Sequence, residues 1–221
     1  MAMMGPPPAG SGSRHTRRLI WRIIRITVIV VLPFFVLVRT GTWLYQSRGI
    51  PTWGALLGAA AVTLGVLTWY GAWVSRSWTG RRRIRLVATR IALPVVAAYC
   101  GYTLVYLARE NAKSDAVREY YTSLHPLFRV ALGTLLLADR DLVVTDVHRT
   151  PADYRRMRLP IKEASLHYRQ KDGYVHAVDL RTIGRPAWRT GLLTIYFRVM
   201  GFRTLRHVGT ADHLHVSLPP R

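Results

Sequence analysis

Cysteine and acidic residues are scarce in this sequence, and both shortages limit what the protein can be. The chain of 221 residues has one cysteine, Cys100, so no disulfide can form within it. Its first 108 positions contain 13 arginines but no lysine, aspartate or glutamate, and all 11 acidic residues follow. Most of the net charge of +21 therefore lies beside apolar stretches. This placement argues against a nucleic-acid-binding surface, which needs a basic stripe on a folded domain.

Three apolar stretches in the first half approach or reach the length needed to cross a bilayer as helices, about 20 residues. They are 19–38, 50–75 and 91–108. Arg22 and Arg25 lie in the first stretch, where their side chains can reach the headgroups. A secretory signal peptide is the rival interpretation, but no small-x-small cleavage site follows the stretch. The sequence therefore predicts a three-helix transmembrane region over 19–108.

The arginines beside these stretches predict how the chain is oriented in the membrane. They are frequent before the first stretch and between the second and third, whereas Arg39 and Arg48 alone lie between the first two. We therefore expect a cytoplasmic N-terminus and a C-terminal domain on the outer face. Residues 1–18 are expected to form a disordered basic arm. Arginine outnumbers lysine 29 to 3, which suggests a GC-rich genome and hence a bacterial cytoplasmic membrane.

The second half has the pattern of a small α+β domain with an antiparallel sheet. Residues 109–141 are expected to be a helical linker, broken near Pro126, with His125 in a loop. Further helices are expected at 151–157 and 186–200. Strands are expected at 142–147, 165–168, 174–180, 204–208 and 213–218, the second and third pairing around an Asp-Gly turn. The last helix shows its period at Trp188, Leu192, Ile195, Tyr196 and Val199, and its aromatic and leucine residues are expected to face the core.

Histidines and aspartates, which bind zinc or transfer protons, gather in this second half. A catalytic zinc needs three protein ligands and an open position for water. His213 and His215 are two residues apart on an expected strand, so they share a face. A single histidine on a strand is more often structural than a ligand, so the residue types alone leave the question open.

The order of these residues resembles the peptidase M15 family, zinc D-alanyl-D-alanine carboxypeptidases and related peptidoglycan endopeptidases. The matching blocks are Ser165-Leu166-His167, Gly173, Ala177-Val178-Asp179 and Asp212-His213-Leu214-His215, preceded by VTDVHRTPADY with Arg149. The resemblance implies an M15-like zinc peptidase core over 142–221. One spacing departs from the family, because His167 and Asp179 are twelve residues apart instead of the usual seven.

The resemblance also implies roles for particular residues. One Zn²⁺ would be held by His167, Asp179 and His215. Asp212 would be the general base that takes a proton from the zinc-bound water. Arg149 would hold a substrate carboxylate or stabilise the oxyanion.

Three further positions are less clearly assigned. Ser165 is expected to support the substrate or a ligand. The long spacing leaves His176 as an alternative to His167 for the metal. His213 is similarly an alternative to His215, although only His215 has the acid-x-x-His spacing.

These residues lead to the expectation of a membrane-anchored zinc metallopeptidase that hydrolyses peptidoglycan stem peptides with a zinc-activated water. D-Ala-D-Ala and L-Ala-D-Glu bonds are both open as the point of cleavage. Two rival functions remain. One is a catalytically silent M15-like domain that binds cell-wall peptides or a membrane partner, and the other is a membrane interaction protein that functions through its spans. The expected partners are the stem peptide and the lipid bilayer, with no nucleic acid, and the oligomeric state is left open.

Overall fold

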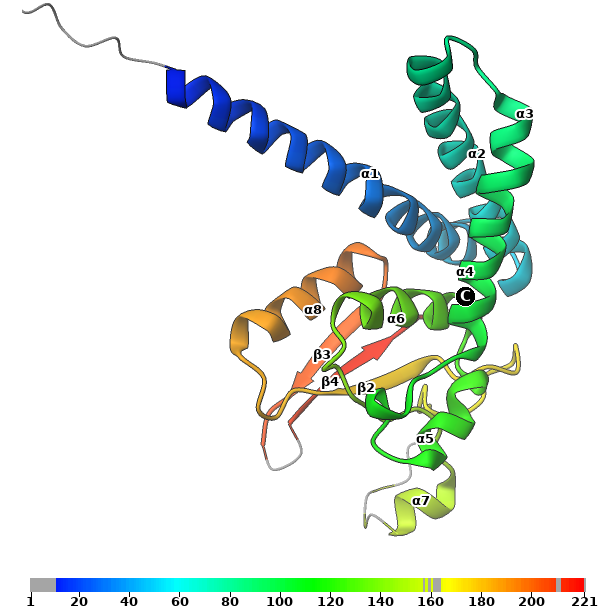
Figure 1. Ribbon diagram of the computed structural model, residues 1–221. Helices are drawn as coiled ribbons and strands as arrows, with labels where there is room; N and C mark the ends of the chain where they lie inside the picture. The colour runs from blue at the N-terminus through cyan, green and yellow to red at the C-terminus, as the bar shows by residue number, and fades with distance from the viewer. Residues whose placement is uncertain (1–10, 157, 159, 161–163, 210–211, 221) are drawn as a thin grey trace, which may run out of the picture.

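Long helices make up the first half of the chain (Figure 1). The computed structural model describes residues 11–156, 158, 160, 164–209 and 212–220. Helix α1 (Ser11–Arg48) leads into α2 (Thr52–Thr79), and a third helical segment consists of α3 (Ile84–Val87), a π-helical turn (Ala88–Ala92) and α4 (Leu93–Val105). Three segments are long and apolar enough to span a membrane: Thr16–Arg48, Thr52–Thr79 and Ile84–Val105. This confirms the prediction of three candidate spans.

The N-terminal arm differs from the prediction where the structure describes it. Residues 1–10 of the expected disordered arm lie outside the described residues. Residues 11–18 are helical and belong to α1, so the prediction of disorder is wrong for them. No proline separates these residues from the apolar stretch, so the helix of that stretch extends towards the N-terminus as far as Ser11.

The second half folds as an α+β domain around one antiparallel sheet, as predicted. Its strands run in the order β1-β2-β4-β3, and every neighbouring pair is antiparallel. The strands are β1 (Val144–Asp146), β2 (Ala177–Arg181), β3 (Arg203–His207) and β4 (His213–Ser217). The helices are α5 (Asp115–Glu119), α6 (Pro126–Ala138), α7 (Pro151–Arg156) and α8 (Ala187–Val199), with 3₁₀ turns at Arg109–Asn111 and Tyr120–Ser123.

The predicted hairpin between 165–168 and 174–180 does not form as two paired strands. Residues 165–168 lie in turns, joined to the following segment by an isolated bridge between Arg169 and Val175. The tight turn itself is present, with Gly173 in the left-handed region at φ 83°. Strand β2 already pairs with β1 on one edge and β4 on the other, so neither edge is left for a hairpin partner.

The two faces of the sheet carry different chemistry. Val178 pairs with Val216, and Leu180 with Leu214, and all four are buried in the core. Helices α6 and α8 lie on one side of the sheet, and α5 and α7 lie on the other (Figure 1). Because side chains alternate along a strand, Asp179 and its partner His215 point to the face opposite those apolar pairs.

The sheet domain is packed directly on the ends of the long helices. One hydrophobic core runs from α1 and α2 through α6 to the sheet. Gly41 of α1 lies against Leu127 of α6, and Gly133 of α6 lies against Thr103 of α4. The Thr42 hydroxyl donates to the Met200 carbonyl at 2.6 Å. These contacts hold the domain at the C-terminal ends of α1 and α4.

Helix α8 is present as predicted, but its expected core residues divide between a buried and an exposed face. The sheet side of α8 is formed by Thr190, Leu193 and Phe197, all buried. The prediction is confirmed for Leu193 and Phe197, and Tyr196 packs against the core. An opposite stripe is exposed: Trp188 by 66%, Leu192 by 57%, Ile195 by 59% and Val199 by 49%. The prediction was wrong for Trp188 and Leu192 because α8 is apolar on two opposite faces, and periodicity does not tell which face meets the sheet.

Candidate metal centre

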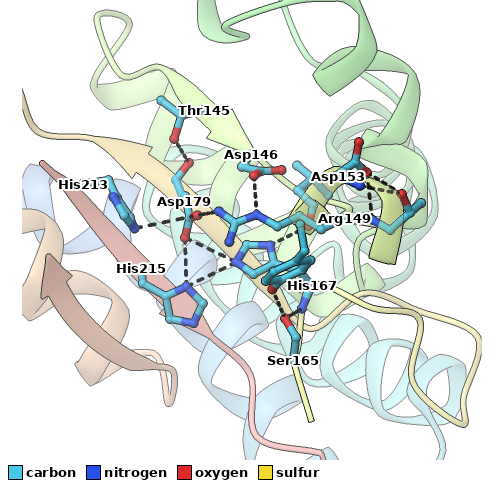
Figure 2. A network of polar contacts seen from close by, with 12 residues as sticks. Thr145, Asp146, Arg149, Asp153, Ser165, His167, Asp179, His213 and His215 are labelled. Carbon is cyan, nitrogen blue, oxygen red and sulfur yellow. Dashed lines mark hydrogen bonds and ion pairs between the residues drawn. The ribbon is translucent and has the colours of Figure 1, made fainter. Parts of the chain in front are cut away.

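Three side chains from distant parts of the chain converge on the face of the sheet opposite α6 and α8 (Figure 2). Asp179 comes from β2, His215 from β4, and His167 from the segment between α7 and β2. Nδ1 of His215 lies 2.8 Å from Oδ1 of Asp179. Nε2 of His167 lies 3.4 Å from both that oxygen and His215 Nδ1. The structure therefore brings together the three residues predicted as metal ligands.

The spacing of these three atoms fits a tetrahedral metal ion. Zinc bonds of 2.0–2.1 Å place ligand atoms about 3.3 Å apart. Two of the three distances are 3.4 Å, and the third, 2.8 Å, is that of a hydrogen bond between imidazole and carboxylate. Two imidazole nitrogens and one carboxylate oxygen are also a donor set that zinc binds in catalytic sites.

His167 is held in the orientation that a metal ligand needs. Its Nδ1 lies 2.8 Å from the carbonyl oxygen of Val147, which only accepts, so Nδ1 donates. Nε2 is therefore left to face Asp179 with its lone pair when the ring is neutral. Ser165 Oγ accepts the backbone N–H of His167 at 3.3 Å and lies 2.7 Å from the Tyr154 hydroxyl. These outer contacts fix the ring before any ligand binds.

The second oxygen of Asp179 faces positive charge. Arg149 joins Asp179 through Nη2 and Asp146 through Nε, both at 2.5 Å. Burial alone raises the pKa of Asp179, but the contacts with His167 and His215 and the charge of Arg149 outweigh it. The pKa therefore lies far below its ordinary value, and the carboxylate is ionised. The sequence reasoning missed Asp146, although its place three residues before Arg149 was a usable signal.

The predicted general base, Asp212, has other partners. One of its oxygens accepts from the Thr182 hydroxyl at 2.5 Å, and the other pairs with Arg206 at 2.9 Å. The hydrogen bond from Arg206, then that from Thr182, lowers the pKa of Asp212. In the described part of the chain, its hydrogen bonds and ion pairs do not reach the three converging residues. The neighbouring His213 does approach them, with Nε2 3.8 Å from Oδ2 of Asp179.

A second group of metal-binding residue types lies on the other side of the sheet, formed by His125, Asp172 and His176. His176 Nε2 lies 2.9 and 3.1 Å from the two oxygens of Asp172. The sequence left His176 as an alternative to His167, but it lies away from Asp179. The two are three residues apart along an extended segment, so they point to opposite faces.

The sequence reasoning missed His125 and Asp172 as members of this second group. His125 lies in the loop directly before α6, as expected, but it is completely buried. Its Nε2 lies 2.9 Å from the Thr52 hydroxyl of α2 and 3.7 Å from Asp172. The Tyr45 hydroxyl of α1 donates to Asp172 at 3.4 Å. No local pattern marks His125, because its partners come from three remote segments.

Solvent access to the histidines differs between the two groups, although Asp172, with 20% of its side chain exposed, is nearly as accessible as His215. The side chains of His125 and His176 are 0% exposed, and Tyr45 and Thr52 lie against them. The side chain of His215 is 23% exposed, which leaves one imidazole of the first group accessible. A catalytic site must admit water and substrate, so the group containing His215 is the candidate reaction centre.

Comparisons with protein-family models, curated proteins and solved structures find no match for this chain. The fold and site by themselves define a helical protein with three candidate membrane spans and a small antiparallel sheet. Two groups of His and Asp side chains beside that sheet could hold a metal ion.

Proposed function

We propose that this protein is a membrane-anchored zinc peptidase that hydrolyses peptide bonds in peptidoglycan stem peptides. The observation that carries the proposal is the convergence of His167, Asp179 and His215 at ligand spacing on one face of the sheet, with the His215 side chain 23% exposed. Their order along the chain resembles that of M15 peptidases, which favours a D-Ala-D-Ala carboxypeptidase or a related endopeptidase. The arginine distribution supports a bacterial cytoplasmic membrane, with the N-terminus in the cytoplasm and the sheet domain outside.

In this proposal His167, Asp179 and His215 hold one zinc ion, which when bound polarises the scissile carbonyl and activates a water molecule. Arg149 neutralises Asp179 through Nη2. Its Nη1 takes no part in the ion pairs with Asp146 and Asp179, and we assign it to the substrate carboxylate. Ser165 keeps His167 in place by accepting its backbone N–H.

Two neighbouring residues compete for the role of general base. Asp212 is the base that the resemblance implies, but the hydrogen bond from Arg206 lowers its pKa and makes it a weaker proton acceptor. His213 is favoured by position, because its Nε2 is 3.8 Å from the Asp179 carboxylate. Asp212→Asn and His213→Gln distinguish them: the base variant loses turnover but keeps zinc, and the other retains most of its turnover.

Zinc content of the full-length protein in detergent, with hydrolysis of purified muropeptides, tests the proposal. We expect about one equivalent of zinc, lost in Asp179→Asn and His215→Gln together with activity. Asp172→Asn is the matched control, since it makes the same change in the second group and should keep zinc. A protein without zinc, or one that loses zinc in Asp172→Asn but not in Asp179→Asn, contradicts the proposal.

A catalytically silent, peptide-binding domain is the second candidate function. It is favoured by the engagement of Asp212 with Arg206 and Thr182, which leaves the implied base occupied. A protein that binds zinc and stem peptides but releases no product from them would establish this alternative.

A further inference from the structure

The outward face of α8 is an apolar stripe that nothing in the sheet domain covers among the described residues. The stripe consists of Trp188, Leu192, Ile195 and Val199, all exposed. At about 100° per residue these positions fall within an arc of about 60°. The opposite side of the helix, with Leu193 and Phe197, already fills the core. A domain helix normally buries one apolar stripe, so a second stripe of large side chains indicates a second apolar partner.

The position of α8 identifies that partner. Its C-terminal end is attached to α1, because the Met200 carbonyl accepts from Thr42 at 2.6 Å and the Gly201 carbonyl accepts from Gln46 at 2.9 Å. Thr42 lies in the last two turns of the first candidate span, Thr16–Arg48. In Figure 1, α8 lies on the side of the sheet that faces α1. The stripe is thus next to the level at which α1 leaves the bilayer.

We propose that α8 is an interfacial helix whose outward stripe lies in the outer leaflet, between headgroups and acyl chains. Its composition fits this environment, since Trp188 suits the interface and the aliphatic side chains suit the acyl boundary. Arg198 is exposed beside the stripe, where its guanidinium can pair with lipid phosphate. The sheet domain therefore lies on the membrane instead of hanging from its spans.

This docking determines which way the candidate metal centre faces. His215 and Asp179 are on the face of the sheet opposite α8. Packed layers lie about 10 Å apart, so with the length of the side chains the centre is held about 15 Å from the axis of α8, away from the lipid. If the proposed function is correct, the substrate is a peptidoglycan stem peptide outside the membrane, and not a peptide lying among the lipid headgroups.

Spin-label accessibility in nanodiscs of phosphatidylethanolamine and phosphatidylglycerol tests the docking of α8. On a Cys100→Ser background, a nitroxide is attached through Leu192→Cys or Ile195→Cys. Leu205→Cys is the matched control, because Leu205 is also 57% exposed but lies opposite His215 on the outer edge strand. The readout is the ratio of label accessibility to oxygen over accessibility to a water-soluble nickel chelate. We expect this ratio to be several-fold higher at positions 192 and 195 than at position 205.

Two results would overturn the proposal. An oxygen-to-nickel ratio at position 192 no higher than at position 205 would mean that the stripe faces water. Dipolar broadening between labels at position 192 would mean that a second copy of the chain covers it. Neither readout involves zinc, so the test stands apart from the proposed peptidase activity, and Asp179→Asn should leave the ratios unchanged.

Discussion

Replacing Asp172 by asparagine tests the buried contact that joins the sheet domain to the long helices. His176 Nδ1 lies 3.1 Å from the Leu218 carbonyl, and its Nε2 lies 2.9 Å from Asp172. The contact is therefore a hydrogen bond to a charged group, the Asp172 carboxylate. Tyr45 of α1 donates to the same carboxylate, which extends the contact to the membrane region.

The size of the effect follows from the charge of this hydrogen bond. A buried hydrogen bond to a charged partner contributes about 1.5–3 kcal/mol. Asparagine keeps the shape of the aspartate side chain but lacks the charge and one acceptor. We expect a loss of about 2 kcal/mol, which lowers the Tm of a chain of this size by roughly 4–8 °C. The assay is thermal unfolding of the full chain in detergent, followed by tryptophan fluorescence.

The pH dependence has a definite sign. Burial raises the pKa of Asp172. Its contacts with His176 and the Tyr174 N–H have a larger effect in the opposite direction, so the pKa lies below its ordinary value of 3.8. The stabilisation is therefore present above pH 3.8 and is lost as the pH falls through the folded-state pKa. The difference in Tm between wild type and Asp172→Asn should be largest at pH 7 and should shrink below about pH 4.

Asp141→Asn is the control for this prediction. Asp141 also pairs with an arginine, Arg189, but its side chain is 76% exposed, so solvent screens the pair. We expect little change in its Tm. Equal Tm values for Asp172→Asn and Asp141→Asn at pH 7, or a gap that widens on acidification, would refute the reasoning.

Two further predictions concern the metal centre and the helix packing. Arg149→Lys should weaken zinc binding about 10- to 100-fold in a chelator competition, because one ammonium cannot bridge Asp146 and Asp179 as two guanidinium nitrogens do; unchanged affinity would count against this. Gly133→Ala should lower the free energy of unfolding by roughly 1–3 kcal/mol, because the alanine Cβ would lie 2.7 Å from Thr103 Cγ2 and 3.4 Å from Thr103 Cα. Gly65→Ala, with nothing within 4 Å, should show no such loss of Tm.

Much of the fold was predictable because it depends on neighbours in the chain. The apolar stretches specify the three candidate spans by length alone, and alternating residues specify β2 and β4. The strand expected at 165–168 was wrong because strand formation needs a free edge, and β1 and β4 occupy both edges of β2. Edge availability is a property of the assembled sheet.

The sequence by itself determined the helical segments, the main strands and the residue types able to bind a metal. Tertiary structure decided which histidine meets Asp179. His167 reaches it because the Val147 carbonyl and Ser165 hold its ring in place, whereas His176 turns to Asp172 on the other face. Tertiary structure also decided which apolar face of α8 the sheet buries. Both choices depend on residues far away in the chain, which local periodicity does not encode.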